Sequence, residues 1–173
     1  PVTNMRYSIV QGPRNSFYNA YSGIARIFTL LLLHGHAPIC YEDGRQRRDY
    51  VFVGDVARAN VLALEDPRAD YHCYNVAGQK TSTVLEVAHL LAQLCGSDAA
   101  PQVTGEYRFG DTRHTTSSWQ SLGELGWRPE TSLEDFLSDY VDWVRQQPDL
   151  ADFYAASQER MRARGVLRRT EAG

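Results

Sequence analysis

Segments with the pattern of β-strands alternate with segments of helical spacing along most of this chain. The strand-like segments are short apolar runs rich in β-branched residues, and they cover residues 2–11, 38–42, 49–53 and 72–77. The helical segments have apolar residues three and four positions apart, and they cover residues 23–34, 56–66, 84–95, 118–125 and 133–144. This alternation predicts an α/β fold. We expect residues 1–147 to form the folded unit.

Local signals predict where three of the helices begin. Asp55 is the expected N-cap of the helix over 56–66, because a short acceptor side chain can bond the free N–H groups of a first turn. Thr83 and Glu86 have the spacing of a capping box, and Thr131 and Glu134 have the same spacing before the last helix. Beyond these helices, we expect residues 148–173 to be a charged, arginine-rich tail, peripheral or frayed.

Composition excludes several classes of function. The chain has 173 residues, of which 43% are apolar and 23% charged, as in globular proteins. A formal net charge of −3 offers no basic field for nucleic acid or an anionic membrane. The longest apolar run, 27–33, is too short to span a bilayer, and the three cysteines are scattered. We therefore expect a cytoplasmic protein with no nucleic-acid or membrane partner.

The motifs of several common enzymes are missing. The 13 glycines contain no GxGxxG or GxxGxxG spacing, and the chain has no P-loop, GxSxG or HExxH motif. His34 and His36 have no third ligand nearby in sequence, so we expect no metal site. Of the 18 basic residues, Lys80 is the single lysine. We assign no catalytic residue, because these residues alone do not supply the groups of a complete catalytic site.

Three segments have residues suited to an anionic ligand. Arg48 begins a strand after a glycine turn, which favours either a solvated turn or a phosphate contact. Arg108 and Asp111 flank Gly110, where they could hold a diphosphate and a sugar hydroxyl, or simply form a salt bridge. Residues 19–23 precede a helix whose free N–H groups could bind phosphate, although capping by a side chain explains this loop equally well.

Taken in order, several segments resemble the extended short-chain dehydrogenase/reductases, the nucleotide-sugar epimerase and dehydratase family. RYSIVQGPR at 6–14 resembles the family's RYxNVYGPR, and YEDG at 41–44 with RDYVFVGDV at 48–56 resembles YGDGxQxRDFVYVxDV. YNVAG at 74–78 resembles YNVGxG, YRFGD at 107–111 resembles YRPGD, and LGWRP at 125–129 resembles LGWxP. Together these motifs cover residues 1–147.

The resemblance implies that the chain is the C-terminal half of such an enzyme: the last part of a Rossmann-type sheet plus a small mixed α/β substrate-binding domain. The family's NAD loop and catalytic YxxxK lie in the preceding half. Val76 stands four residues before Lys80, so the chain cannot contain a YxxxK.

The resemblance also implies roles for particular residues. Arg48 and Arg108 would hold the diphosphate, and Asp111 would hold the ribose. Tyr41 would contact the base, while Tyr21 and Ser22 would approach the phosphates. Tyr7 and Ser8 would lie near the nicotinamide of NAD, a cofactor expected of the intact enzyme and not of this chain alone.

We therefore expect the nucleotide-sugar-binding half of an NAD-dependent sugar 4-epimerase, with a UDP- or dTDP-sugar as ligand. The alternatives are half of a 4,6-dehydratase or 4-ketoreductase, or a non-catalytic binding module. The expected protein partners are a missing N-terminal half or a complementary chain, or a second copy bound through an exposed apolar edge. Ile9 and Gln11 replace the family's usual asparagine and tyrosine, which indicates a different sugar or sugar orientation.

Overall fold

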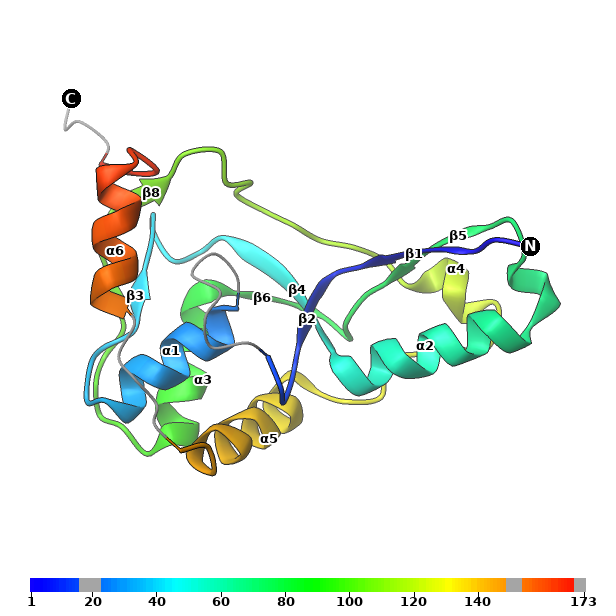
Figure 1. Ribbon diagram of the computed structural model, residues 1–173, viewed down its shortest axis with the longest axis horizontal. Coiled ribbons are helices and arrows are strands. Elements are labelled where there is room, and N and C mark those ends of the chain that lie inside the picture. Colours follow the sequence, from blue (N-terminus) through cyan, green and yellow to red (C-terminus); the bar gives the residue numbers. More distant parts are fainter. Residues whose placement is uncertain (16–22, 149–153, 170–173) are drawn as a thin grey trace.

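The elements gather into two lobes at opposite ends of an elongated molecule (Figure 1). The structure is a computed structural model, and it describes residues 1–15, 23–148 and 154–169. Parallel strand pairs and covering helices confirm the α/β class that the alternating pattern predicts.

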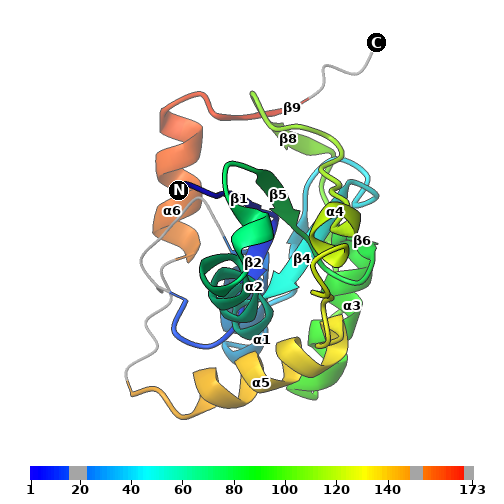
Figure 2. The ribbon, with the colours of Figure 1, turned by 90° about the vertical axis from the view of Figure 1, so that its right-hand side faces the viewer.

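The first lobe is built on a parallel pair of strands. Strand β1 (Asn4–Tyr7) pairs with β5 (Cys73–Val76), and helix α2 (Val53–Glu65), the short 3-10 helix Pro67–Ala69 and α4 (Gln120–Gly123) lie against them (Figures 1 and 2). The core of this lobe is apolar and comprises Val51, Val56, Ala59, Ala63, Ala69, Tyr74, Val76, Leu122 and Trp127.

The second lobe is mainly helical. Helices α1 (Ile24–Leu33), α3 (Val84–Cys95) and α5 (Leu133–Arg145) pack on one another, and β3 (Ile39–Cys40) pairs in parallel with β7 (Gln102–Val103). The largest buried side chains of its core include Phe136, Leu137, Tyr140 and Leu91. Predicted helix 118–125 is reduced to the four residues of α4, whereas 133–144 matches α5 closely.

A three-stranded sheet connects the lobes. Its order is β2 (Ile9–Gln11), β4 (Arg47–Phe52) and β6 (Thr81–Thr83), with β4 parallel to β2 and antiparallel to β6. The strand predicted over 2–11 is therefore divided at Ser8, because its first part pairs with β5 and its second with β4.

The C-terminal residues contain more regular structure than the sequence indicates. Helix α6 (Tyr154–Ala163) is followed by β9 (Leu167–Arg169), which pairs antiparallel with β8 (Glu106–Arg108). Met161 and Leu167 are buried. The weak periodicity that predicts a frayed tail reflects the high polarity of α6.

Two of the predicted helix caps are wrong and one is confirmed. Helix α3 has the full capping box between Thr83 and Glu86. Helix α2 begins at Val53 rather than after Asp55, and Ser132 caps α5 by accepting from the N–H of Asp135. Both errors have one cause: Asp55 and Thr131 bond each other and not the free N–H groups of their own helices.

Candidate functional site

Three of the residues expected to bind ligand lie together at the end of the helical lobe. The Arg108 guanidinium is 5.7 Å from the centre of the Tyr41 ring, and its Nη2 is 2.7 Å from Asp111 Oδ2. The Arg108 and Asp111 side chains are 24% and 38% exposed, so water and solutes reach both. A cation, a carboxylate acceptor and an aromatic face therefore share one accessible surface.

Backbone contacts explain why these residues meet. Strand β8 carries Arg108, and the N–H of Glu42 donates to the carbonyl of Glu106 at 2.7 Å, which places Tyr41 beside that strand. Gly110 follows with φ of 88°, a left-handed conformation that favours glycine, and the N–H of Asp111 returns to the carbonyl of Arg108. This turn brings the Asp111 carboxylate back onto Arg108.

Arg48 lies on strand β4 and faces the segment that follows Asp111. Its Nη1 donates to the carbonyls of Arg47 (2.9 Å) and Arg113 (2.7 Å). The Arg113 guanidinium in turn binds Glu42 and Asp43, and its hydrogen bond lowers the pKa of Asp43 to about 2. The structure thus joins Arg48 to the 111–115 loop through Arg113.

The residues expected near a nicotinamide have different environments. Tyr7 is 48% exposed, and its hydroxyl donates to Asn60 Oδ1 on α2 at 2.7 Å. The Ser8 hydroxyl oxygen is buried and has no hydrogen-bond partner among the described residues. Neither residue belongs to a glycine-rich phosphate loop, so these residues do not by themselves form a dinucleotide site. Tyr21 and Ser22 lie outside the described residues.

A cavity of about 860 Å³ adjoins the end of β2, lined by residues 9–15 and 52–54. Most of its wall is apolar, but the buried Gln11 side chain contributes a carbonyl oxygen that has no hydrogen-bond partner among the described residues. Ile9 and Gln11, the two departures from the family pattern, both line this cavity.

Two buried aspartates of the 48–56 segment, neither of them expected to bind ligand, hold the surrounding segments in place. The first is Asp49, whose carboxylate accepts from the N–H groups of Gly78 (2.7 Å) and Ser117 (3.3 Å). Burial raises the pKa of Asp49, and these hydrogen bonds partly oppose the shift. Gly78 is required here, because a Cβ would stand 1.9 Å from the carbonyl oxygen of Tyr50.

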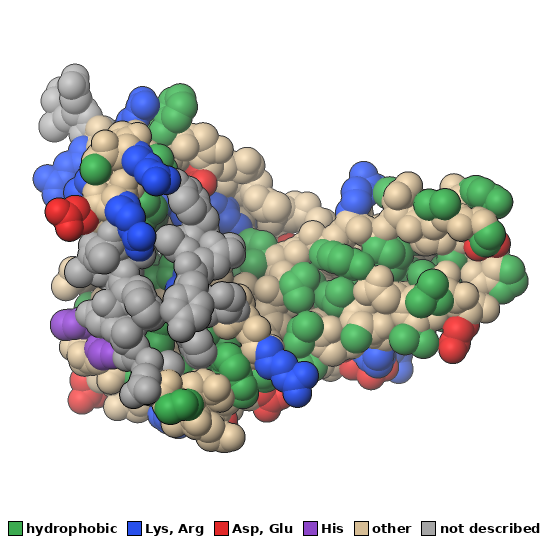
Figure 3. Space-filling model, viewed as in Figure 1, with side chains coloured by type: hydrophobic (Ala, Val, Ile, Leu, Met, Phe, Trp, Pro, Cys, Tyr) green, Lys and Arg blue, Asp and Glu red, His purple; other side chains and the backbone are tan. Residues whose placement is uncertain are grey.

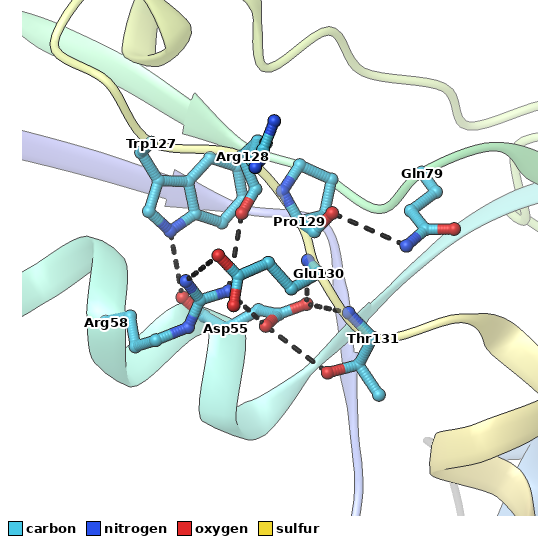
Figure 4. A network of polar contacts seen from close by, with 8 residues as sticks. All are labelled: Asp55, Arg58, Gln79, Trp127, Arg128, Pro129, Glu130 and Thr131. Carbon is cyan, nitrogen blue, oxygen red and sulfur yellow. Dashed lines mark hydrogen bonds and ion pairs between the residues drawn. The ribbon is translucent and has the colours of Figure 1, made fainter.

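The second of them, Asp55, joins α2 to the segment before α5 (Figure 4). Its carboxylate accepts from the N–H groups of Glu130 and Thr131, each at 3.1 Å, and from Arg58 Nη2 at 2.6 Å. The indole N–H of Trp127 donates to the Asp55 carbonyl at 3.2 Å. This network gives the LGWRP segment a structural role in the fold.

The described residues contain neither a grouping suited to a metal ion nor a helix suited to a membrane. In 1–15, 23–148 and 154–169, no three His, Cys, Asp or Glu side chains are grouped so that they could hold a metal ion. None of the helices in the same ranges has the length and apolar character needed to cross a membrane.

The parallel strand pairs and the helices that cover them define the class of α/β proteins, here with a cationic side chain beside an aromatic ring at the end of one lobe. The profile of the NAD dependent epimerase/dehydratase family matches residues 1–77. The chain is similar to members of this family over most of its length.

Individual relatives show this similarity. The chain is 33% identical over 150 residues to a dTDP-L-rhamnose 4-epimerase of Burkholderia thailandensis, covering 86% of this chain and 41% of the relative. It is 34% identical over 120 residues to a dTDP-glucose 4,6-dehydratase of an Actinoplanes species, and the match covers 69% of this chain and 37% of the relative. The crystal structure of Thermotoga maritima UDP-glucose 4-epimerase with UDP-glucose superposes with a TM-score of 0.76 and 36% sequence identity. The superposition covers 82% of this chain and 45% of that chain. The chain thus spans less than half the length of these relatives.

Proposed function

We propose that this chain is the nucleotide-sugar-binding part of an NAD-dependent nucleotide-sugar 4-epimerase. The observation that carries the proposal is the accessible group of Tyr41, Arg108 and Asp111. A diphosphate can take the paired donors of a guanidinium, a ribose hydroxyl can donate to the carboxylate, and a base can contact the aromatic ring. Arg48 would add positive charge beside the same loop.

The chain would bind and orient the sugar, not transform it. Its residues include no YxxxK and no dinucleotide loop, so the proton-transfer groups and NAD would come from the rest of the intact enzyme. Binding a remote diphosphate contributes to the reaction, because it places the sugar where those groups act.

The apolar surface of the first lobe supports a second proposal, that another polypeptide covers this lobe. Six of the exposed large hydrophobic residues lie in or beside β1 and α2 (Figure 3); they are Val2, Tyr7, Val53, Val61, Leu64 and Tyr71. Among the described residues, β1 pairs on one edge only, with β5. A complementary polypeptide that adds a strand to β1 would satisfy its free edge and cover this surface.

Calorimetry with UDP-glucose tests the ligand assignment. We expect Arg108→Ala to weaken binding about tenfold or more, because a charge-assisted contact to phosphate contributes roughly 1.5–3 kcal/mol. Arg68→Ala is the matched control, since Arg68 also pairs with a nearby aspartate, at 2.6 Å, but in the other lobe. Unchanged binding in both Arg108→Ala and Arg48→Ala would remove the assignment.

Light scattering tests the partner surface. At rising concentration, the chain alone should form dimers or larger assemblies through the exposed apolar residues of β1 and α2. A monomer that stays monodisperse and unfolds cooperatively would contradict the proposal of a covered edge.

A 4,6-dehydratase is the second candidate, favoured by the 34% identity to the Actinoplanes enzyme. Both reactions would use the same diphosphate contacts, so binding experiments do not separate them. Product analysis does: an assay of the intact enzyme on a nucleotide-glucose gives either the 4-epimer or a 4-keto-6-deoxy sugar.

A further inference from the structure

The C-terminal segment reaches back to the candidate ligand site. Strand β9 pairs with β8 so that Leu167 stands opposite Arg108, and the N–H of Phe109 donates to the carbonyl of Val166 at 2.8 Å. Helix α6 leads into β9 and contacts it. The C-terminal segment is therefore hydrogen-bonded to β8, the strand that carries Arg108, the residue proposed to bind the diphosphate.

Gln158 on α6 makes the most direct of these contacts. Its side chain is buried, and its Nε2 donates to the Tyr41 hydroxyl at 2.6 Å, across 117 residues of sequence. The ring of the same tyrosine lies under the Arg108 guanidinium. One buried amide thus holds the aromatic face on which the cation rests.

A second contact fixes β8 itself. The Glu106 carboxylate is 9% exposed and binds two arginines of the C-terminal segment, Arg162 at 3.4 Å and Arg169 at 3.3 Å. A carboxylate buried to this extent needs such partners, because desolvation without them is costly. Strand β8 and the C-terminal segment therefore stabilise each other's position.

We infer that Gln158 is a positioning residue for recognition of the nucleoside part of the ligand. It orients Tyr41 through the hydroxyl, so that the ring presents a fixed face to the base. Arg108 has an independent support in Asp111, and its grip on a diphosphate does not depend on Gln158. This inference rests on the proposed function and extends it to a residue outside the family motifs.

The test compares two probes, UDP and inorganic pyrophosphate, on the full 173-residue chain. Gln158→Met keeps the length of the side chain and removes its amide. We expect this variant to bind UDP about 3- to 10-fold more weakly, the range for loss of one hydrogen bond, while pyrophosphate binding stays unchanged. Gln147→Met is the control, since that partly buried glutamine donates to the Trp143 carbonyl of helix α5 at 3.0 Å instead of to the Tyr41 hydroxyl.

Tyr41→Phe gives an independent measurement, because it removes the acceptor hydroxyl and keeps the ring. It should reproduce the loss of UDP affinity, and the double variant should bind no more weakly than either single one. If Gln158→Met does not fold, Tyr41→Phe alone still decides, since unchanged UDP affinity would overturn the inference.

Other results have distinct meanings. An equal loss for UDP and pyrophosphate would show a general structural role and overturn the inference. A wild-type chain that binds neither UDP nor UDP-glucose would instead remove the proposed function on which the inference rests.

Discussion

Two aspartates of this protein each pair with an arginine three residues away, at nearly the same distance but in opposite lobes. Asp55 is 2.6 Å from Arg58, and its side chain is 3% exposed. Asp111 is 2.7 Å from Arg108, and its side chain is 38% exposed. The spacing is the same in both pairs, yet only the second aspartate is open to a ligand.

The partners of the two carboxylates show what burial changes. Asp55 accepts from the backbone of two residues as well as from Arg58, so the protein itself satisfies its oxygens. The Asp111 carboxylate is open to water and, under the proposed function, would accept from a ribose hydroxyl. An acid–base pair at this spacing therefore indicates a ligand site only when its surroundings leave it accessible.

Asp55→Ala should have the largest effect on stability. The change removes the acceptor of two partly buried N–H groups and the buried partner of Arg58, and removing one partner of a network around a buried carboxylate costs about 3–5 kcal/mol. Chemical denaturation with a tryptophan fluorescence readout measures it, since Trp127 bonds the same residue. A loss below about 1 kcal/mol would mean that the two aspartates are equivalent after all.

Asp49→Asn should have a smaller, pH-dependent effect. Because burial raises the pKa of Asp49 above its unfolded value of about 4, its contribution to stability is fully present below that pH and declines as pH rises through the raised value. The uncharged variant lacks this decline, so its deficit relative to wild type should shrink between acid and neutral pH. Urea midpoints measured across that range decide it, and parallel curves for the two proteins would contradict the expectation.

Asp111→Asn should have the smallest effect on stability. The Arg108 pair is partly exposed, and such pairs contribute less than about 1 kcal/mol. Nucleotide-sugar affinity should nevertheless fall, because the amide is a weaker acceptor for a ribose hydroxyl. Thermal unfolding and calorimetry on one preparation separate the two effects, and a large drop in melting temperature would assign Asp111 to the fold.

The fold class and the main helices could be predicted from local sequence patterns. The α/β class, α1, α3 and α5 all follow from apolar spacing, and Arg108 with Asp111 follows from a short motif. Neither β9 nor Gln158 has a comparable signal in the sequence. Strand β9 has three residues, and its formation depends on pairing with β8, far away in the chain.

The helix caps show most clearly where prediction from local sequence fails. The Thr83–Glu86 box forms as its spacing indicates, because both partners lie within one turn and no distant group competes for them. Asp55 has an equally suitable side chain, but the fold brings the N–H groups of Glu130 and Thr131 to it, and these take its oxygens.

Local sequence patterns therefore indicate the main helices, several of the strands, and the residues whose charge suits a diphosphate. The tertiary structure alone decided which of two similar aspartates is enclosed and which is accessible, and that a glutamine 117 residues away supports Tyr41. The reason is physical: hydrogen-bond preference along one turn is a local property, whereas desolvation and the identity of distant partners are set only when the chain packs.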